Sequence, residues 1–109
     1  MNHMDRIKFI EQIEKIYKDG VELIKKKNAD YADDTDPFRN FRNADIVGIS
    51  PEKAILIRIL DKITRIANLL NRQGLVRDEK MEDSILDAIN YLAILKVFLE
   101  NKTYANKIY

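Results

Sequence analysis

The sequence predicts an all-α protein built as a bundle of three long helices. Apolar residues make up 46% of the 109 positions and recur every three to four residues over three long stretches, which is the period of amphipathic helices. Residues that interrupt helices are rare, with 3 Gly and 2 Pro in the whole chain. The length is that of one domain, so residues 1–109 are expected to form a single α-helical unit, with helices at about 5–27, 51–72 and 78–101.

The balance of charges argues against a nucleic-acid or membrane partner. With 19 basic and 18 acidic residues the net charge is +1, which leaves no basic footprint for duplex nucleic acid or a membrane surface. No apolar run approaches the ~20 residues of a membrane-spanning helix, and no signal peptide is expected, so a cytoplasmic protein is predicted. The chain has no Cys, and its single histidine, His3, lies at the N-terminus, which disfavours thiol and imidazole catalysis.

The first helix, about 5–27, is expected to begin at Asp5, a good N-cap residue. Its apolar positions follow the helical period: Phe9, Ile10, Ile13, Ile16, Tyr17, Val21, Leu23 and Ile24. Gly20 interrupts this stripe, and it marks either a close approach of another helix or a bend. The run Lys25–Lys27 is expected in the last turn, where cations complement the helix dipole or contact a phosphate.

The segment 28–50 shows no persistent helical or strand period, and Pro37 interrupts any helix there. A loop of about 20 residues in a small domain is usually either disordered or functional. This loop carries Tyr31, Phe38 and Phe41, whereas disordered segments are poor in aromatic residues. We therefore expect an ordered loop whose rings pin it to the helices, with some of them free to stack on a nucleotide base.

The second helix, about 51–72, has Ser50 as its expected N-cap and Pro51 at its first position. Its apolar residues fill an arc of roughly 140° at the helical period; they are Ile55, Leu56, Ile59, Leu60, Ile63, Ile66, Ala67 and Leu70. The opposite arc is polar and carries Arg58, Asp61, Lys62, Arg65, Asn68 and Arg72.

The third helix, about 78–101 with Asp78 as its expected N-cap, is apolar nearly all round and is therefore predicted to be the central one. Its polar residues Glu79, Asp83, Asp87 and Asn90 share one side. Enclosed carboxylates need partners, which are Arg or Lys, a metal ion, or both. The excess apolar surface of this helix, with Phe98, Leu99 and Tyr104 near its end, predicts a homo-oligomer formed through it.

The short connection 73–77 predicts that the second and third helices are antiparallel neighbours. Counting outwards from it pairs Arg72 with Glu79, Asn68 with Asp83, Arg65 with Asp87 and Asp61 with Asn90. One interpretation of this arrangement is an interhelical salt-bridge network around Arg65 and Asp87. The other is a polar pocket, in which guanidinium groups hold phosphate and carboxylates hold a divalent ion or a ribose hydroxyl.

Several short motifs, taken together and in this order, resemble the nucleotide-modification-associated domain 1 family of small phage and bacterial proteins. They are Asp30-Tyr31, Asn40-Phe41, Asp61-Lys62-Ile63-Thr64-Arg65, and Asp83 with Asp87, Asn90 and Tyr91. The resemblance covers residues 27 to about 95 and implies a phage-type protein with a nucleotide ligand. It implies site positions at Asp30, Tyr31, Asp61, Lys62, Arg65, Asp83, Asp87 and Asn90.

The chain is more distantly similar to the all-α nucleotide pyrophosphohydrolases of the MazG and dimeric dUTPase kind, which hold Mg²⁺ with carboxylates on two helices. Glu79, Glu82, Asp83 and Asp87 match the second of their acidic elements. The first has no counterpart, because the second helix places cations around Asp61 where acids are expected. This departure puts Mg²⁺-dependent hydrolysis in doubt and favours holding a phosphate.

Three hypotheses follow. In the first, the protein binds a nucleotide and acts on it as a hydrolase or transferase with Mg²⁺ as cofactor; Asp83 and Asp87 are then catalytic, and Glu79, Asp83 and Asp87 hold the metal. In the second, it is a non-catalytic sponge for a host cyclic-nucleotide or ADP-ribose-type immune signal. In the third, it is a helical protein-interaction module. The ligand-binding residues under the first two are Asp30, Tyr31, Phe41, Arg58, Asp61, Lys62, Arg65 and Asn90.

Overall fold

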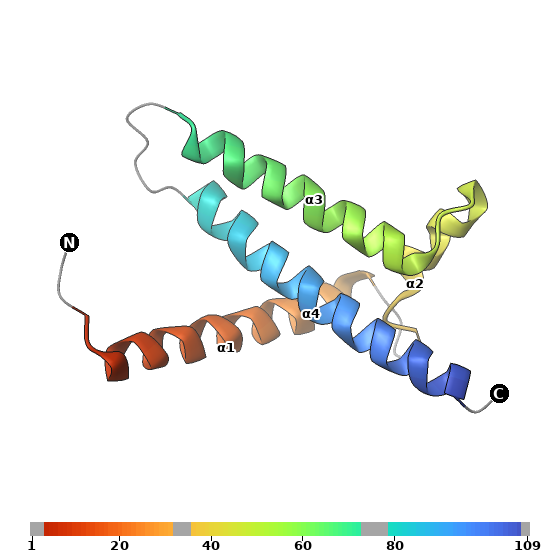
Figure 1. The fold of residues 1–109 in the computed structure, drawn as a ribbon, viewed down its shortest axis with the longest axis horizontal. Helices are drawn as coiled ribbons and strands as arrows, with labels where there is room; N and C mark the ends of the chain where they lie inside the picture. Colours follow the sequence, from red (N-terminus) through yellow and green to blue (C-terminus); the bar gives the residue numbers. More distant parts are fainter. Residues whose placement is uncertain (1–3, 32–35, 73–78, 108–109) are drawn as a thin grey trace.

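The computed structural model describes residues 4–31, 36–72 and 79–107, except the side chains of 28–31, 79 and 103–107. Every element in these ranges is helical, so the all-α prediction is confirmed (Figure 1). The elements are three long helices and two short ones: α1 (Arg6–Tyr31), α2 (Arg39–Arg42), the 3-10 helix η1 (Asn43–Val47), α3 (Pro51–Leu70) and α4 (Glu79–Lys107).

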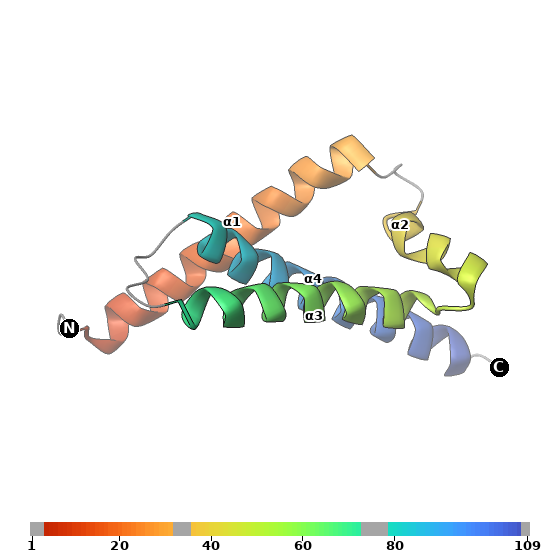
Figure 2. The same ribbon diagram turned by 90° about the horizontal axis from the view of Figure 1, so that it is seen from above.

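The helix α4 occupies the centre of the fold, as its apolar composition predicts. It runs antiparallel to α3 along most of its length, and α1 crosses it on another side (Figures 1 and 2). The ion pair between Lys102 and Glu52, 2.8 Å from Nζ to Oε1, joins α4 to the first turn of α3. The expected cap Asp78 and the connection 73–77 lie outside the described residues.

The observed first residues of α1 and α3 agree with the predicted ones more closely than the observed last residue of α1 does. Asp5 caps α1, because its Oδ1 accepts a hydrogen bond of 2.8 Å from the backbone N–H of Lys8. Ser50 is extended, with φ −67° and ψ 155°, and Pro51 takes the first position of α3 as expected. However, α1 continues to Tyr31, so the expectation that the Lys25–Lys27 run forms its last turn is wrong.

The described part of the predicted loop 28–50 is less irregular than expected, since the end of α1, the helix α2 and the helix η1 lie within it. The carboxylate of Asp36 holds the start of α2, accepting hydrogen bonds from the backbone N–H of Phe38 (3.1 Å) and from Nε of Arg42 (3.0 Å). The Phe38 ring packs edge-on against Phe98 of α4, with centroids 5.2 Å apart. The prediction that aromatic rings pin this segment to the helices is confirmed for Phe38.

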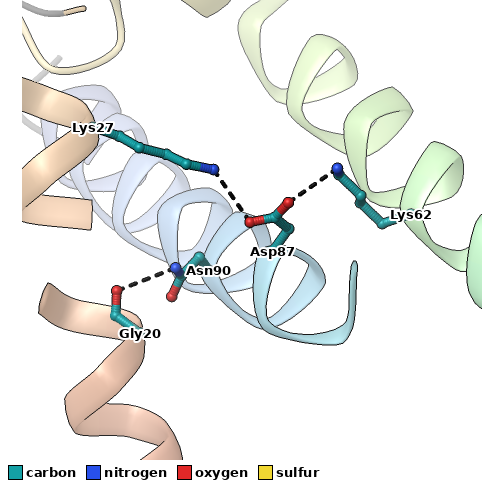
Figure 3. A network of polar contacts seen from close by, with 5 residues as sticks. All are labelled: Gly20, Lys27, Lys62, Asp87 and Asn90. Carbon is teal, nitrogen blue, oxygen red and sulfur yellow. Dashed lines mark hydrogen bonds and ion pairs between the residues drawn. The ribbon is translucent and has the colours of Figure 1, made fainter. Parts of the chain in front are cut away.

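Gly20 lies where α1 crosses α4 and permits their close approach, which confirms one of its two interpretations. A Cβ at this position would lie 2.7 Å from Oδ1 of Asn90 and 3.5 Å from Cδ1 of Leu86. Asn90 is buried, and its Nδ2 donates a 3.1 Å hydrogen bond to the backbone oxygen of Gly20 (Figure 3). The glycine and the amide together fix the crossing point.

The hydrophobic core is small. Among the described residues, the buried apolar side chains are Ile55, Ile59 and Leu69 of α3 with Ala88 of α4. Three of them come from α3 and one from α4, so the described core lies at the contact of this antiparallel pair. None of the described helices combines the length and the apolar character needed to cross a lipid bilayer.

Candidate functional site

One polar cluster joins all three long helices. Asp87 of α4 accepts from Nζ of Lys62 on α3 at 3.0 Å and from Nζ of Lys27 on α1 at 3.2 Å (Figure 3). Its side chain is 15% exposed. The salt-bridge interpretation of Asp87 therefore describes the structure, but the predicted partner Arg65 is wrong. Lys62 lies three residues, or about one helical turn, before Arg65 on α3, and it is the side chain that reaches the carboxylate.

The environment of Asp87 holds its carboxylate in the charged form. Burial by itself raises the pKa of Asp87, but the hydrogen bonds and positive charges of Lys62 and Lys27 outweigh it and lower the pKa below its ordinary value. A carboxylate of this kind stabilises the fold while it is ionised. Asp87 thus fastens α1 and α3 to the central helix.

This arrangement predicts an acid-dependent loss of stability. Because the pKa of Asp87 is lowered on folding, its contribution is fully present above the ordinary value of 3.8 and is lost as pH falls further. Replacing it, Asp87→Asn, should lower the free energy of unfolding by about 1–2 kcal/mol at pH 7, a value reduced by the exposure of both lysines. The difference from wild type should shrink below pH 3.8 in urea titrations.

Asp61→Asn is the matched control, because Asp61 is an exposed aspartate on α3. This substitution should change the free energy of unfolding by no more than about 0.5 kcal/mol, both at pH 7 and below pH 3.8. An Asp87→Asn variant as stable as wild type at pH 7 would show that the carboxylate does not hold the helices together.

A second polar site lies between α2, η1, α3 and α4. It is a cleft of about 490 Å³ lined by Asn40, Phe41, Asn43, Ala44, Arg58 and Tyr91. We call it the Arg58 cleft. Its volume lies within the range of small-molecule sites, which is about 300–1,000 Å³.

The fold places these side chains through one aromatic contact. Phe41 of α2 packs edge-on against Tyr91 of α4, with ring centroids 6.3 Å apart and an interplanar angle of 82°. This contact holds α2 over the α3/α4 pair, beside the point where Arg58 projects from α3. Arg58 is exposed, and no carboxylate of a described residue pairs with its guanidinium. The cleft therefore offers an unpaired cation next to aromatic rings.

A smaller hollow of about 170 Å³ adjoins the Arg58 cleft. It shares Asn40, Phe41, Ala44 and Arg58 with the cleft and adds the apolar side chains Ile49, Ala54 and Ile57. The combined site is polar at the amides and the guanidinium and apolar beneath them. Such a division suits a ligand with one flat apolar part and one charged part.

The structure separates the other predicted site residues. Asn90 is buried and holds α1, whereas Asp61 and Arg65 are exposed on α3. Asp83 is exposed and lines a groove between α1 and α4, away from the Arg58 cleft. The side chains of Asp30, Tyr31 and Glu79 lie outside the described residues. Two predicted residues, Phe41 and Arg58, line the cleft, and two others, Lys62 and Asp87, form the ion pair.

The expected Mg²⁺ site at Glu79, Asp83 and Asp87 stays a prediction. Both carboxylate oxygens of Asp87 accept from lysines, and two ammonium groups are the opposite of the oxygen cage that Mg²⁺ needs. Over the described ranges, no three Asp, Glu or His side chains gather into a group that could hold a metal ion. The residues around Asp87 therefore do not fit the ion in this arrangement.

The predicted site missed Asn40, Asn43, Ala44, Tyr91 and Lys27. Asn40 and Tyr91 could have been predicted from the sequence, since the motifs Asn40-Phe41 and Asn90-Tyr91 carry part of the family resemblance. Lys27 belongs to a run of three lysines, and nothing in the run distinguishes the one that reaches Asp87.

Comparison with protein-family models, with curated proteins and with solved structures finds no match to this chain. The side chains of the two sites therefore carry the functional argument by themselves.

Proposed function

We propose that the Arg58 cleft binds a nucleotide and holds it intact. The supporting observation is the unpaired guanidinium of Arg58 beside the Phe41–Tyr91 aromatic pair in a cleft of about 490 Å³. A nucleotide combines a flat base with an anionic phosphate, and these are the two parts that such a lining recognises.

The phosphate belongs at Arg58. A guanidinium presents a planar fork of donors that matches two phosphate oxygens, and it is always charged at neutral pH. Because Arg58 has no carboxylate partner among the described residues, binding a phosphate breaks no existing ion pair. Lys62, another of the predicted cations, is already paired with Asp87 and contributes to the fold instead.

The base belongs on the aromatic side of the cleft. Stacking on an aromatic ring is worth about 1–3 kcal/mol per base and tolerates any base. The amides of Asn40 and Asn43 each carry donors and acceptors, which suit a base edge or a ribose hydroxyl. These amides, rather than the ring, would set the choice of base.

The lining favours retention over turnover. Among the described residues of the cleft none is an acid, a histidine or a lysine, so the commonest general bases do not line it. A phage-encoded sponge for a host cyclic-nucleotide or ADP-ribose-type signal would need this binding alone. Mg²⁺-dependent hydrolysis or transfer through Asp83 and Asp87 is the competing proposal, and the same experiment tests it.

The test is a retention assay on a mixed pool of nucleoside mono- and diphosphates, cyclic dinucleotides and ADP-ribose isomers. The chain is incubated at about 100 μM with and without Mg²⁺ and ultrafiltered, and chromatography is run on the filtrate and on the heat-denatured protein fraction. A binding protein should deplete one class of nucleotide from the filtrate and release it intact on denaturation. At a Kd near 1 μM, corresponding to about −8 kcal/mol, depletion is nearly complete.

Two results would contradict the proposal. A new product that forms only with Mg²⁺ would make the protein an enzyme, with Asp83 and Asp87 the first residues to replace. A pool that passes unchanged at this concentration would remove the nucleotide and leave the helical interaction module as the function to pursue.

A further inference from the structure

The α3/α4 pair has two broad sides, and one of them is uncovered. The C-terminal half of α1 and all of α2 lie behind the pair in Figure 1, and Figure 2 places them together on one side of it. On the opposite side, α1 reaches α4 at the groove that Ile85 and Ile89 line, and the described elements leave the exposed apolar side chains of α3 uncovered. The sequence predicted an apolar arc of about 140° on α3, which is wider than a single neighbouring helix can bury.

The uncovered side carries exposed apolar side chains along both helices. On α3, at about 100° per residue, four apolar side chains share an arc of about 80° next to the buried Ile55 and Ile59. On α4, three more recur every seven residues; the first of them, Ile85, also lines the groove between α1 and α4. We call this surface the hairpin face; its residues are Leu56, Leu60, Ile63, Leu70, Ile85, Leu92 and Leu99.

These side chains are unusually exposed for their size. Their exposed fractions run from 41% at Ile85 and Leu99 to 62% at Leu70. Monomeric proteins rarely expose a contiguous apolar patch spanning two helices, and such patches mark interaction sites. Because the patch spans two helices, a single helix or an extended peptide would leave part of it in water.

The chain exposes more surface than a compact monomer of its mass. The chain exposes 9093 Å², roughly 2,800 Å² more than the ~6,300 Å² of a compact 12.8 kDa monomer. Its radius of gyration is 16.8 Å, against about 13 Å for a compact chain of this length. A standard protein interface buries ~800 Å² on each partner, so the excess is more than enough for one.

We propose that the hairpin face is covered by the same face of a second copy, forming a homodimer whose centre is a four-helix bundle of two α3/α4 pairs. A two-fold axis lets one apolar face meet its own copy, which is how most dimers form. The net charge of +1 sets no long-range repulsion against self-association. The leucines spaced seven residues apart on α4 suit the side-by-side packing of long helices in such bundles.

This dimer refines the expectation that oligomers form through the α4 surface alone. Phe98, part of that expected surface, packs on Phe38 and is not in the hairpin face. The apolar side chains of α3 supply the other half of the face. Arg58 lies on the side of α3 that carries α2, and the two nucleotide clefts would therefore open on the outer surface of the dimer. Dimerisation and nucleotide binding can then succeed or fail independently.

The test is sedimentation velocity on the full chain without nucleotide. The protein concentration is varied from about 1 to about 100 μM, because the dimer fraction depends on it. Wild type should sediment at twice the 12.8 kDa chain mass at the upper concentrations. Leu92→Lys, which places a charge at the centre of the hairpin face, should raise the dissociation constant at least ~10-fold. The matched control is Ile46→Lys, since Ile46 is 89% exposed on η1 and lies off the face.

A second control separates the hairpin face from the other apolar surface, the stripe on α1. Phe9 of that stripe is 52% exposed, and Phe9→Lys should leave the dimer intact. If Leu92→Lys loses its helical circular dichroism, covalent carbene labelling of wild type across a dilution series replaces it, and labelling at Leu60 and Leu92 should rise as the dimer dissociates.

The proposal is overturned if the wild type still sediments as a 12.8 kDa monomer at about 100 μM, the highest concentration of the series. It is equally overturned by a folded Leu92→Lys variant that dimerises as tightly as wild type. Labelling that rises at Phe9 and not at Leu92 would assign the interface to α1.

Discussion

Replacing Arg58 with alanine should weaken nucleotide binding by about 1.5–3 kcal/mol, a fall in affinity of roughly 10- to 150-fold. The guanidinium is the one cation that lines the described part of the cleft, and it has no carboxylate partner there to compensate for its loss. Isothermal titration with the nucleotide retained from the mixed pool measures the change directly. Stability should change by less than about 0.5 kcal/mol, because Arg58 is exposed.

Arg65→Ala is the matched control for this prediction. Arg65 is an exposed arginine on the same helix, seven residues further along and outside the cleft. The sequence analysis places both Arg58 and Arg65 among the ligand-binding residues, whereas Arg58 alone of the two lines the cleft, so the two variants decide between them. Equal losses in both variants would indicate a diffuse electrostatic effect, and a loss in Arg65→Ala alone would place the ligand elsewhere on α3.

Placing a methyl group on the helix crossing, Gly20→Ala, should lower the free energy of unfolding by about 1–3 kcal/mol, because overpacking and a broken buried hydrogen bond both act there. The new Cβ would lie 2.7 Å from Oδ1 of Asn90, so the amide must move away from the backbone oxygen that it contacts. On an exposed helix the same change is stabilising by about 1 kcal/mol, which makes the predicted sign informative. Chemical denaturation followed by circular dichroism measures it.

The double variant Gly20→Ala with Asn90→Ala isolates the contact. Removing the amide makes room for the methyl group, so Gly20→Ala should be neutral or stabilising in that background. If it is as destabilising there as in wild type, the close approach at Gly20 does not explain the effect. Asn101→Ala, an exposed asparagine that donates to the oxygen of Val97 within the same helix, serves as the control for Asn90→Ala.

The helices could be predicted from the sequence because their periods are long and their start residues are specific. Asp5 and Pro51 mark the starts of α1 and α3 within one residue. The end of α1 could not be located in the same way, because no Gly or Pro follows Gly20 before Pro37. The lysine run suggested a helix end, but a charge run is equally stable within a solvated helix face.

The candidate site was less predictable, since it depends on how elements pack. The register of α3 on α4 is set by side-chain packing around Ile55 and Ile59, and sequence counting gave the partner of Asp87 wrongly by one turn. The cleft exists only because Phe38 and Phe41 fasten α2 to α4. The sequence indicated that these rings would anchor the segment, but it did not indicate which helix would receive them.

The most direct test of the central claim is an NMR titration of the ¹⁵N-labelled wild-type chain with the four common nucleoside 5′-diphosphates. The proposed function predicts saturable chemical-shift changes concentrated at the amides of Asn40, Phe41, Asn43, Arg58 and Tyr91, the residues that line the cleft. Changes that concentrate instead at Lys27, Lys62 and Asp87 would show that the ion-pair cluster is the ligand site. Spectra that do not change at millimolar nucleotide, a concentration at which even ligands bound by about −4 kcal/mol are visible, would contradict nucleotide binding by this protein.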